Sequence, residues 1–456
     1  MKKKKILLLS DDLRMHSGIA TVSKDIVMET LNEYDWVQIA GAIKHPDKGK
    51  VFDMSSGLGE YGIENGYLKV YPVDGYGDEN VLREVMELEK PDAILHYTDP
   101  RFWIWLYKME AEIRRDIPIF YYNIWDDLPD PQYNTNYYRS SDLLMSISKQ
   151  TYGINKRLLK PHGYEDWQTT YVPHGISSRR FNKIEDGDTD LMVFNDKFGL
   201  TDKTFRVLYS NRNIRRKMPG DVALAFKYFV DELPEEQRDD CVLIFHCAPS
   251  DPNGTDLPRM CRHLMPDHNV IFTHQVNNGQ PFHDGMMNKI FNSADVYVNM
   301  ASNEGFGLGS AEALTVGTPI IVNMTGGMQD QCGVRDDEGN LLTAEDYIEL
   351  GSNHRGKYKT HGEWVKPVYP TSISLQGSPP TPYIWDDRCQ PEDVAKNLRE
   401  FYDMGREERK RLGALGSKFC RENKMTATAM GQNFIDSMNV AFDKWKPRER
   451  YTMEKV

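Results

Sequence analysis

The stretch DVYVNMASNEGFGLGSAEALTVGTPIIV, residues 295–322, decides the fold of this 456-residue chain. Residues 296–299 predict a strand, the glycine-rich segment after it predicts a tight turn, and a helix is expected to run on through Glu312. Gly317 suits the C-terminal cap of that helix. A helix N-terminus preceded by glycines presents backbone N–H groups and the positive end of the helix dipole. The stretch therefore predicts a binding site for a diphosphate near Gly307.

Two glutamates flank this turn, and each is expected to bind a different part of a ligand. Glu304 lies before the helix, where its carboxylate can accept hydrogen bonds from sugar hydroxyls, and Glu312 lies two turns later, where it can accept those of a ribose diol. A carboxylate beside a diphosphate needs hydroxyl donors to satisfy it. The pair therefore favours a nucleotide sugar over a bare phosphate as the ligand.

The stretch resembles the retaining GT-B glycosyltransferases, especially glycosyltransferase family 4, whose two glutamates stand in Glu-Gly-Phe-Gly-Leu and Glu-Ala-Leu-x-x-Gly-x-Pro. Glu304 and Glu312 begin these two motifs here. The resemblance implies transfer of a sugar from a nucleoside-diphosphate sugar to an acceptor hydroxyl, with retention of configuration. It also implies donor-binding residues, namely Glu304, Gly305, Phe306, Gly307, Leu308 and Glu312, with Glu304 also acting in catalysis.

Elsewhere, short apolar runs alternate with helical patterns in two successive series, which is typical of parallel sheets built from βαβ units. We expect an α/β chain of the GT-B type, with two Rossmann-like domains facing each other across a cleft. The N-terminal acceptor domain would span residues 1–182, and the C-terminal nucleotide-sugar domain would span 205–425. Residues 183–204 are predicted to be a linker region, 332–390 an irregular insertion, and 426–456 a helix that returns to the N-terminal domain.

A basic loop follows the first strand of the second series. Its sequence, Ser210 to Lys217, carries Arg212 and Lys217 at the approximate spacing of an arginine and a lysine in the family. Cations at the carboxyl end of a strand neutralise a diphosphate, and an arginine can engage two oxygens at once. We predict that Arg212 and Lys217 act in catalysis, although a solvated basic loop is the plainer alternative.

Three further residues are expected to contact the donor. Gly18 stands in a loop that usually holds two glycines in the family, and His174 lies in a segment, Tyr-Val-Pro-His-Gly-Ile, that resembles the one before the interdomain linker. Gln275 follows a predicted strand and is placed near the base by position alone.

Two residues at the ends of N-terminal strands are candidates for the chemistry. His96 ends one strand in the place where relatives have a histidine facing the cleft, and Asp126 ends the next strand. Trp125 replaces the histidine that many relatives have before this aspartate. A hydrogen-bonded structural histidine and a capping aspartate are the alternatives.

Charge and composition exclude some other classes of protein. The net charge is −12, which argues against a surface coated with positive charge for nucleic acid, and no segment approaches the length of a membrane helix. A cytoplasmic protein is expected, in the host cytoplasm if the chain is viral. Its six cysteines show no Cys-x-x-Cys pair, so buried free thiols are expected. No cofactor or metal is expected, because Arg212 and Lys217 can supply the positive charge; the acidic run at 185–190 is interpreted as a solvated turn.

The sequence is compatible with two classes of acceptor. The chain also resembles bacteriophage glycosyltransferases at residues 325–331 and 382–387. This resemblance implies that the acceptor could be a hydroxymethylated base of viral DNA. A glycan or lipid-linked sugar is commoner in the broad family and agrees better with the acidic charge. The N-terminal half is rich in aromatic residues from 102 to 138, a minority of which we expect to line the acceptor site.

Two other functions stay open. A nucleotide-sugar epimerase of the same architecture would act on donor alone, and product analysis without acceptor separates it from a transferase. A non-catalytic nucleotide-sugar sensor would keep binding its partner after Glu304→Ala. The oligomeric state is not indicated by the sequence.

Overall fold

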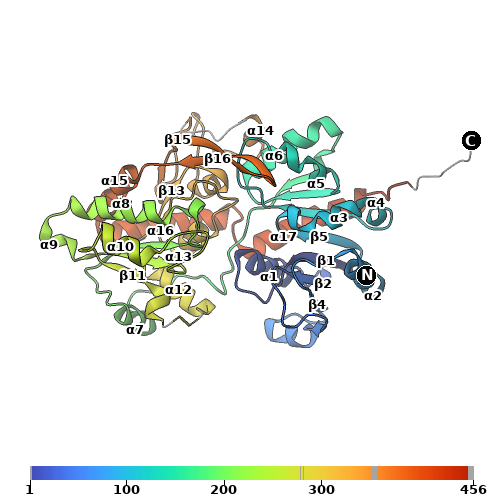
Figure 1. The fold of residues 1–456 in the computed structure, drawn as a ribbon, viewed down its shortest axis with the longest axis horizontal. Coiled ribbons are helices and arrows are strands. Elements are labelled where there is room, and N and C mark those ends of the chain that lie inside the picture. The colour runs from blue at the N-terminus through green and yellow to red at the C-terminus, as the bar shows by residue number, and fades with distance from the viewer. Residues whose placement is uncertain (1–2, 278, 281, 351–356, 450–456) are drawn as a thin grey trace, which may run out of the picture.

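The computed structural model describes residues 3–277, 279–280, 282–350 and 357–449. Parts of two segments discussed above, 351–356 and 450–456, lie outside the described residues. Two α/β domains make up the molecule, and Figure 1 shows most of the N-terminal domain in blue to teal beside the C-terminal domain, most of which is green to orange.

The N-terminal domain is built on an eight-stranded sheet of order β3-β4-β2-β1-β5-β6-β7-β8. Every pairing is parallel except that of β3 with β4. The strands are β1 (Lys4–Asp11), β2 (Tyr34–Gly41), β3 (Phe52–Asp53), β4 (Leu68–Pro72), β5 (Ala93–Tyr97), β6 (Ile119–Asn123), β7 (Leu143–Ser146) and β8 (Thr169–Tyr171). The helices are α1 (Gly18–Thr30), α2 (Glu79–Glu89), α3 (Ile104–Lys108), α4 (Glu110–Ile113), α5 (Thr135–Arg139) and α6 (Lys149–Leu159).

Burial on both faces explains the continuous apolar run of β1. Ile6 and Leu8 pack into the core that also holds residues of α1, whereas Leu7 and Leu9 pack into a second core on the opposite face, with residues of α2. Successive side chains of a strand point to opposite faces, so a parallel strand covered on both sides needs apolar residues at every position.

The C-terminal domain has a six-stranded parallel sheet of order β11-β10-β9-β12-β13-β14. Its strands are β9 (Phe205–Ser210), β10 (Cys241–His246), β11 (Val270–Phe272), β12 (Val296–Asn299), β13 (Ile320–Asn323) and β14 (Val365–Val368). The main helices are α8 (Pro219–Asp231), α9 (Glu235–Arg238), α10 (Leu257–Leu264), α11 (Thr273–Val276), α12 (Asp284–Asn292), α13 (Leu308–Val316), α14 (Asp346–Glu349), α15 (Pro391–Asp403) and α16 (Gly405–Glu422).

The region 183–204, predicted to be a linker, contains the helix α7 (Thr189–Lys197). Asp188 caps this helix, since its side chain accepts a hydrogen bond from the backbone N–H of Leu191 at 2.8 Å. Asp186 forms an ion pair with Lys410 of α16 at 2.6 Å. The acidic run is therefore used for helix capping and for contacts with α16.

The prediction of an irregular insertion at 332–390 is wrong for much of the segment. It supplies β14, which extends the C-terminal sheet beside β13, and a hairpin of β15 (Ser372–Ser378) and β16 (Thr381–Arg388). Pro367 within β14 obscures the strand in the sequence, but an edge strand tolerates a proline because one of its sides needs no ladder hydrogen bonds.

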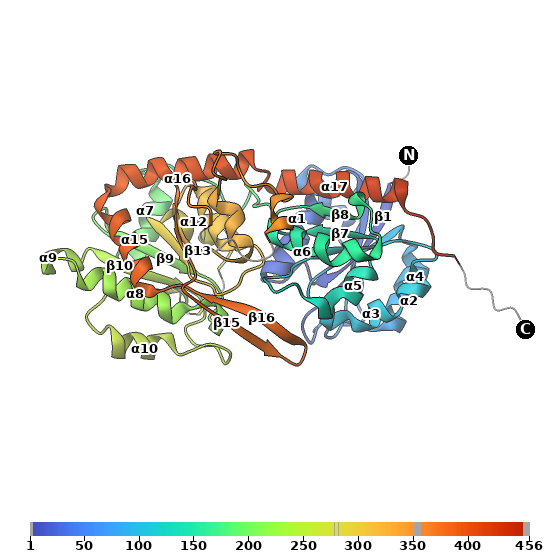
Figure 2. The same cartoon turned by 90° about the horizontal axis from the view of Figure 1, so that it is seen from above.

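The hairpin connects the two domains. The backbone N–H of Trp385 donates to the carbonyl of Leu128 at 2.7 Å, and the Tyr133 hydroxyl donates to the carbonyl of Tyr383 at 2.7 Å. In Figure 2 the hairpin extends from the C-terminal domain toward the N-terminal one. It therefore holds the loop that follows β6 against the C-terminal domain.

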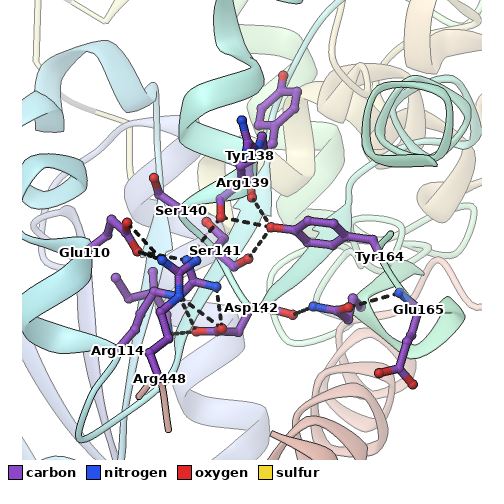
Figure 3. Close-up of polar contacts among 12 residues, drawn as sticks. Glu110, Arg114, Tyr138, Arg139, Ser140, Ser141, Asp142, Tyr164, Glu165 and Arg448 are labelled. Carbon is purple, nitrogen blue, oxygen red and sulfur yellow. Dashed lines mark hydrogen bonds and ion pairs between the residues drawn. The ribbon is translucent and has the colours of Figure 1, made fainter. Parts of the chain in front are cut away.

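The last helix, α17 (Ala427–Lys444), returns to the N-terminal domain as expected, and Figure 2 shows it continuing the direction of α16. Tyr34 donates to the Asn439 side chain at 2.8 Å, and the rings of Phe120 and Phe442 lie 5.4 Å apart. Beyond α17, Arg448 forms an ion pair with Glu110 at 3.0 Å (Figure 3). Its backbone N–H also donates to the carbonyl of Arg114, a buried residue paired with Asp142.

Candidate functional site

Two adjoining cavities open between the domains. The first, of about 470 Å³, is lined by Asp126, Lys217 and Glu304 among others; we call it the Glu304 cavity. The second, of about 510 Å³, is lined by Glu312, and we call it the Glu312 cavity. Both are bounded by Ser17, Gly18, Asn211, Leu308 and Gly309, so they form one continuous cleft. A cleft of this size suits a ligand larger than a single sugar.

Two helix N-termini meet where the cavities join. Gly18 begins α1 of the N-terminal domain, and Leu308 begins α13 of the C-terminal domain. A Cβ atom on Gly18 would lie 3.3 Å from the Leu308 side chain, so this glycine allows the close approach of the two helices. The first N–H groups of each helix have no partner within the helix, and both dipoles direct positive potential to the junction. The junction is thus suited to an anion.

The glycines of the Glu304 turn are required by its surroundings. A Cβ atom on Gly305 would lie 2.9 Å from the carbonyl oxygen of Ile124, in the N-terminal domain, and one on Gly309 would lie 2.2 Å from the Tyr297 hydroxyl. Gly307 has φ of +87° as the N-cap of α13, a backbone conformation that favours glycine. The turn is therefore fixed both by its own conformation and by contact with the other domain.

A cluster of charged side chains lies over this turn. Lys217 donates to the Glu304 carboxylate, and Arg216 donates to the same oxygen at 3.1 Å. Arg216 also lies 3.6 Å from Asp126 of the N-terminal domain. The cluster thus connects the loop after β9, the turn after β12 and the loop after β6.

The charges in the cluster shift one another's pKa values. Burial acts to raise the pKa of Glu304, but Lys217 and Arg216 outweigh it and hold that pKa below its usual range. Burial also raises the pKa of Asp126, against the attraction of Arg216. Burial lowers the pKa of the Lys217 ammonium, against the attraction of Glu304. Glu304 is therefore anionic at neutral pH and compensated by two cations.

Arg212 lines the Glu304 cavity but faces another partner. Its side chain is 64% exposed and its guanidinium pairs with Asp251 at 3.1 Å. Arg216, four residues later, contacts Glu304, whereas the catalytic role expected of Arg212 stays a prediction. Sequence reasoning overlooked Arg216 because the run Arg215-Arg216-Lys217 gives no sign of which cation faces the turn.

His174 lines the Glu304 cavity, and its contact with the donor stays a prediction. Its Nδ1 atom lies 2.8 Å from the Tyr122 hydroxyl, and its ring packs edge-on against Phe306 at 5.1 Å. Burial lowers the pKa of His174 to about 3, so the imidazole is neutral and supports the Phe306 side of the turn.

The expectation that His96 faces the cleft is wrong. His96 is fully buried, its Nδ1 atom lies 2.6 Å from the Tyr107 hydroxyl, and its ring stacks on Tyr121. The next residue, Tyr97, lines the Glu304 cavity instead. Neighbouring residues of β5 point to opposite faces of the sheet, so a shift of one position exchanges a cleft residue for a core residue.

The Glu312 cavity has a mixed acidic and aromatic lining. Burial raises the pKa of Glu312 to about 7, against the attraction of Arg180. At another part of the lining the rings of His246 and Phe282 lie 4.8 Å apart, and His274 lies 5.3 Å from His246. The placement of Gln275 in the donor site is wrong, because Gln275 is exposed while His274 before it lines the cavity.

The aromatic residues between 102 and 138 are mainly core residues. Trp103, Tyr107, Tyr121, Tyr122 and Tyr138 are buried. Of the aromatic residues in that range, none lines either cavity in the part of the chain that the structure describes. The expectation that some of them line the acceptor site therefore has no support in these cavities.

The segment 325–331 holds the Glu304 turn in place through hydrogen bonds to its backbone. The Gly327 N–H donates to the Glu304 carbonyl at 2.8 Å, and the Gln331 side chain donates to the Phe306 carbonyl at 2.7 Å. The Thr325 hydroxyl lies 3.0 Å from a carboxylate oxygen of Asp127 and 2.9 Å from one of Asp387, on β16. This segment thus links the turn, the N-terminal domain and the hairpin.

All six cysteines are buried and have free thiols. Over the described ranges, no group of three or more His, Cys, Asp or Glu side chains is arranged to hold a metal ion. Within the same ranges, every helix is too short or too polar to cross a bilayer.

Comparisons with known proteins agree with this geometry. Residues 220–352 match the family model described as Glycosyl transferases group 1. An uncharacterized glycosyltransferase of Methanocaldococcus jannaschii is 28% identical over 118 residues, which is 26% of this chain and 23% of that protein's length.

Solved structures are similar over nearly the whole chain. Anabaena HepE in complex with UDP and glucose superposes with a TM-score of 0.62 at 13% identity, covering 96% of this chain and 100% of that one. The sucrose-phosphate synthase of Thermosynechococcus elongatus gives 0.64 at 13% identity, covering 97% and 100%. A glycosyltransferase of Rickettsia africae gives 0.63 at 11% identity, covering 97% and 100%. The chain therefore has the GT-B fold, two Rossmann-like domains facing each other across a ligand cleft.

Proposed function

We propose that this chain is a glycosyltransferase that moves a sugar from a nucleoside-diphosphate sugar to an acceptor hydroxyl. The observation that carries the proposal is the Glu304 turn, which lies at the N-terminus of α13 in the interdomain cleft with Lys217 and Arg216 over it. The match of residues 220–352 to the group 1 glycosyl transferases supports it.

The cleft suggests how the donor would lie. Its diphosphate would sit at the junction of the two cavities, against the first amides of α13 and near α1. The sugar would occupy the Glu304 cavity, where the carboxylate accepts its hydroxyls. The ribose would reach Glu312, with the base toward His246, His274 and Phe282.

Transfer would proceed with retention and without a protein nucleophile. The acceptor hydroxyl would attack the anomeric carbon from the face that the diphosphate leaves, and a leaving oxygen of the diphosphate would take the hydroxyl proton. The bond to the diphosphate breaks as the new glycosidic bond forms. Lys217, Arg216 and the helix N-terminus would stabilise the negative charge that develops on the leaving group. We propose that these groups act without a metal ion.

Asp126 is the residue best placed on the acceptor side. It belongs to the N-terminal domain, lines the Glu304 cavity and lies beside Arg216. We propose that its carboxylate accepts a hydrogen bond from the acceptor and thereby positions the attacking hydroxyl. The acceptor itself is proposed to be either a glycan or lipid-linked sugar, or a hydroxymethylated base in DNA.

A donor screen tests the proposal. Purified protein is incubated with UDP-glucose first, since HepE has been solved with it, and then with other nucleotide sugars, and the released nucleoside diphosphate is measured by mass spectrometry. Each donor is tested alone, with oligosaccharide and lipid-linked acceptors, and with DNA containing hydroxymethylated cytosine. Acceptor-dependent release that is lost in Lys217→Ala supports the transferase. Conversion of donor alone indicates an epimerase, and binding without turnover indicates a sensor; either result contradicts the proposal.

A further inference from the structure

A separate small cavity of about 60 Å³ lies on the C-terminal domain, between the linker, the beginnings of β9 and β12, and α16. We call it the linker pocket. It shares no lining residue with the Glu304 or Glu312 cavity. Its lining is dominated by cations: five basic side chains line it, Lys183, Arg206, Arg406, Arg409 and Lys410, against two carboxylates, Asp186 and Asp295.

The two carboxylates of the linker pocket already have partners. Asp295 accepts from the Arg409 guanidinium at 3.0 Å and from the backbone N–H of Arg206 at 3.0 Å. Asp186 pairs with Lys410 at 2.6 Å and lies 3.9 Å from Arg406. Two carboxylates outside the lining also contact these cations: Asp202 lies 3.4 Å from Arg406, and Glu407 lies 3.0 Å from Lys410. Throughout the described residues, Lys183 and Arg206 form no ion pair with a carboxylate. Two of the five cations of the pocket, Lys183 and Arg206, are thus left without a carboxylate partner among the described residues.

Arg206 is the most informative of these cations. It is 6% exposed, and its two terminal nitrogens donate to backbone carbonyls, those of Ser293 at 3.2 Å and Thr201 at 2.7 Å. Its Nε–H group has no hydrogen-bond partner although it is buried. A buried charged donor without a partner is costly unless a ligand or water satisfies it.

The surrounding charges agree with an anion in this place. Burial is the main cause that lowers the pKa of Arg206, and the positive charge of Arg406 lowers it further, against the attraction of Asp295 and Asp202. Burial likewise lowers the pKa of Lys183, and Lys410 and Arg406 add to the effect, against Asp186 and Glu185. A bound anion would oppose these shifts, because an opposite charge favours the protonated form of each cation.

We propose that the linker pocket binds a tetrahedral oxyanion of the size of phosphate, held by Arg206, Lys183 and Arg406. Its volume is several times the roughly 10–15 Å³ that one water molecule needs by this measure, so a compact anion fits whereas a nucleotide does not. Guanidinium groups suit such an anion because they donate two hydrogen bonds in a planar fork.

The position of the pocket gives the bound anion a structural effect. Lys183 belongs to the linker, Arg206 to β9 and Arg406 to α16, so one anion would join three elements. Gly317, the C-terminal cap of α13, also lines the pocket. The Glu304 turn stands at the other end of this nine-residue helix, roughly 14 Å away. The linker pocket is therefore separate from the donor cleft, and the helix α13 connects the two sites.

Thermal unfolding of the full-length protein tests the proposal. Inorganic phosphate and sulfate are titrated against chloride at matched ionic strength, and the unfolding temperature is recorded. We expect the temperature to rise to saturation with the oxyanions and not with chloride, as it does when a ligand binds the native state. The double variant Lys183→Gln/Arg406→Gln should weaken the apparent affinity at least tenfold.

Two further samples separate the possible sources of the effect. Lys217→Ala should keep the oxyanion response, because that cation serves the donor cleft only. The control Lys418→Gln, also on α16 but paired with Glu422 outside the pocket, should behave like the wild type. A sugar phosphate should stabilise less than free phosphate if the pocket takes the free ion, and equally if it takes a phosphate group of a larger molecule. An equal response in the wild type and the double variant, or none in either, would overturn the proposal.

Discussion

The ammonium group of Lys217 donates a hydrogen bond to the carboxylate of Glu304, and this contact joins two loops 87 residues apart in the chain. The loops meet because β9 and β12 are parallel neighbours, so their carboxyl ends reach the same edge of the sheet. The contact places a cation directly beside the turn at the N-terminus of α13. It is the arrangement on which the proposed function depends.

Lys217→Ala should lower kcat by roughly 100-fold to 1,000-fold, the cost expected when one preorganised donor to the leaving group is lost. Steady-state release of nucleoside diphosphate measures it. The control Lys227→Ala, a half-buried lysine of α8 paired with Asp231 and remote from both cavities, should leave kcat unchanged. A Lys217 variant with full activity would refute the assignment of the diphosphate to this turn.

Arg216→Gln should reduce kcat/KM more than Arg212→Gln, by roughly 100-fold against less than about tenfold. The reason is that Arg216 contacts Glu304 and lies near Asp126, whereas Arg212 is exposed and pairs with Asp251. Arg215→Gln, an exposed change in the same loop, serves as the control. The opposite order of effects would mean that Arg212 leaves Asp251 and turns onto the bound donor.

Glu312→Gln should stabilise the protein at high pH while weakening donor binding. Because burial raises the pKa of Glu312 to about 7, the native state retains a proton that the unfolded state releases above about pH 4.5. This carboxyl therefore costs stability as the pH rises from about 4.5 to 7, by at most roughly 3 kcal/mol. Urea unfolding at pH 4.5 and pH 8 should show a gain at pH 8 only, with Glu422→Gln as the exposed control. An equal gain at both pH values would contradict the pKa of Glu312.

His96→Leu should lower the free energy of unfolding by about 1–3 kcal/mol, since it leaves the buried Tyr107 hydroxyl without this partner. The kcat of the folded fraction should not change. Burial lowers the pKa of His96 to about 3, so its contribution to stability is present above about pH 6.5 and declines as the pH falls toward 3. The difference between wild type and variant should therefore shrink in acid. A tenfold loss of kcat with stability intact would show that His96 takes part in the chemistry after all.

Much of the fold was predictable where the local pattern is strong. The last helix was expected within 426–456, and it lies at Ala427–Lys444. The strands β2 and β4 were not foreseen, because polar residues interrupt their apolar runs. The edge strand β14 was missed because its partner β13 is distant in the chain. The hairpin was missed although its two strands are adjacent in the chain, because β15 is largely exposed and has no buried apolar run.

The sequence by itself determined the turn at residues 303–309, since glycine conformation and helix capping act over a few residues. It also determined the alternation of strands and helices that leads to the GT-B fold, because periodicity is local as well. Only the tertiary structure decided that Tyr97 rather than His96 and His274 rather than Gln275 face the cleft, and that Arg212 pairs with Asp251. These choices depend on which face of an element is covered and on charges brought close by folding, and neither is a property of the neighbouring sequence.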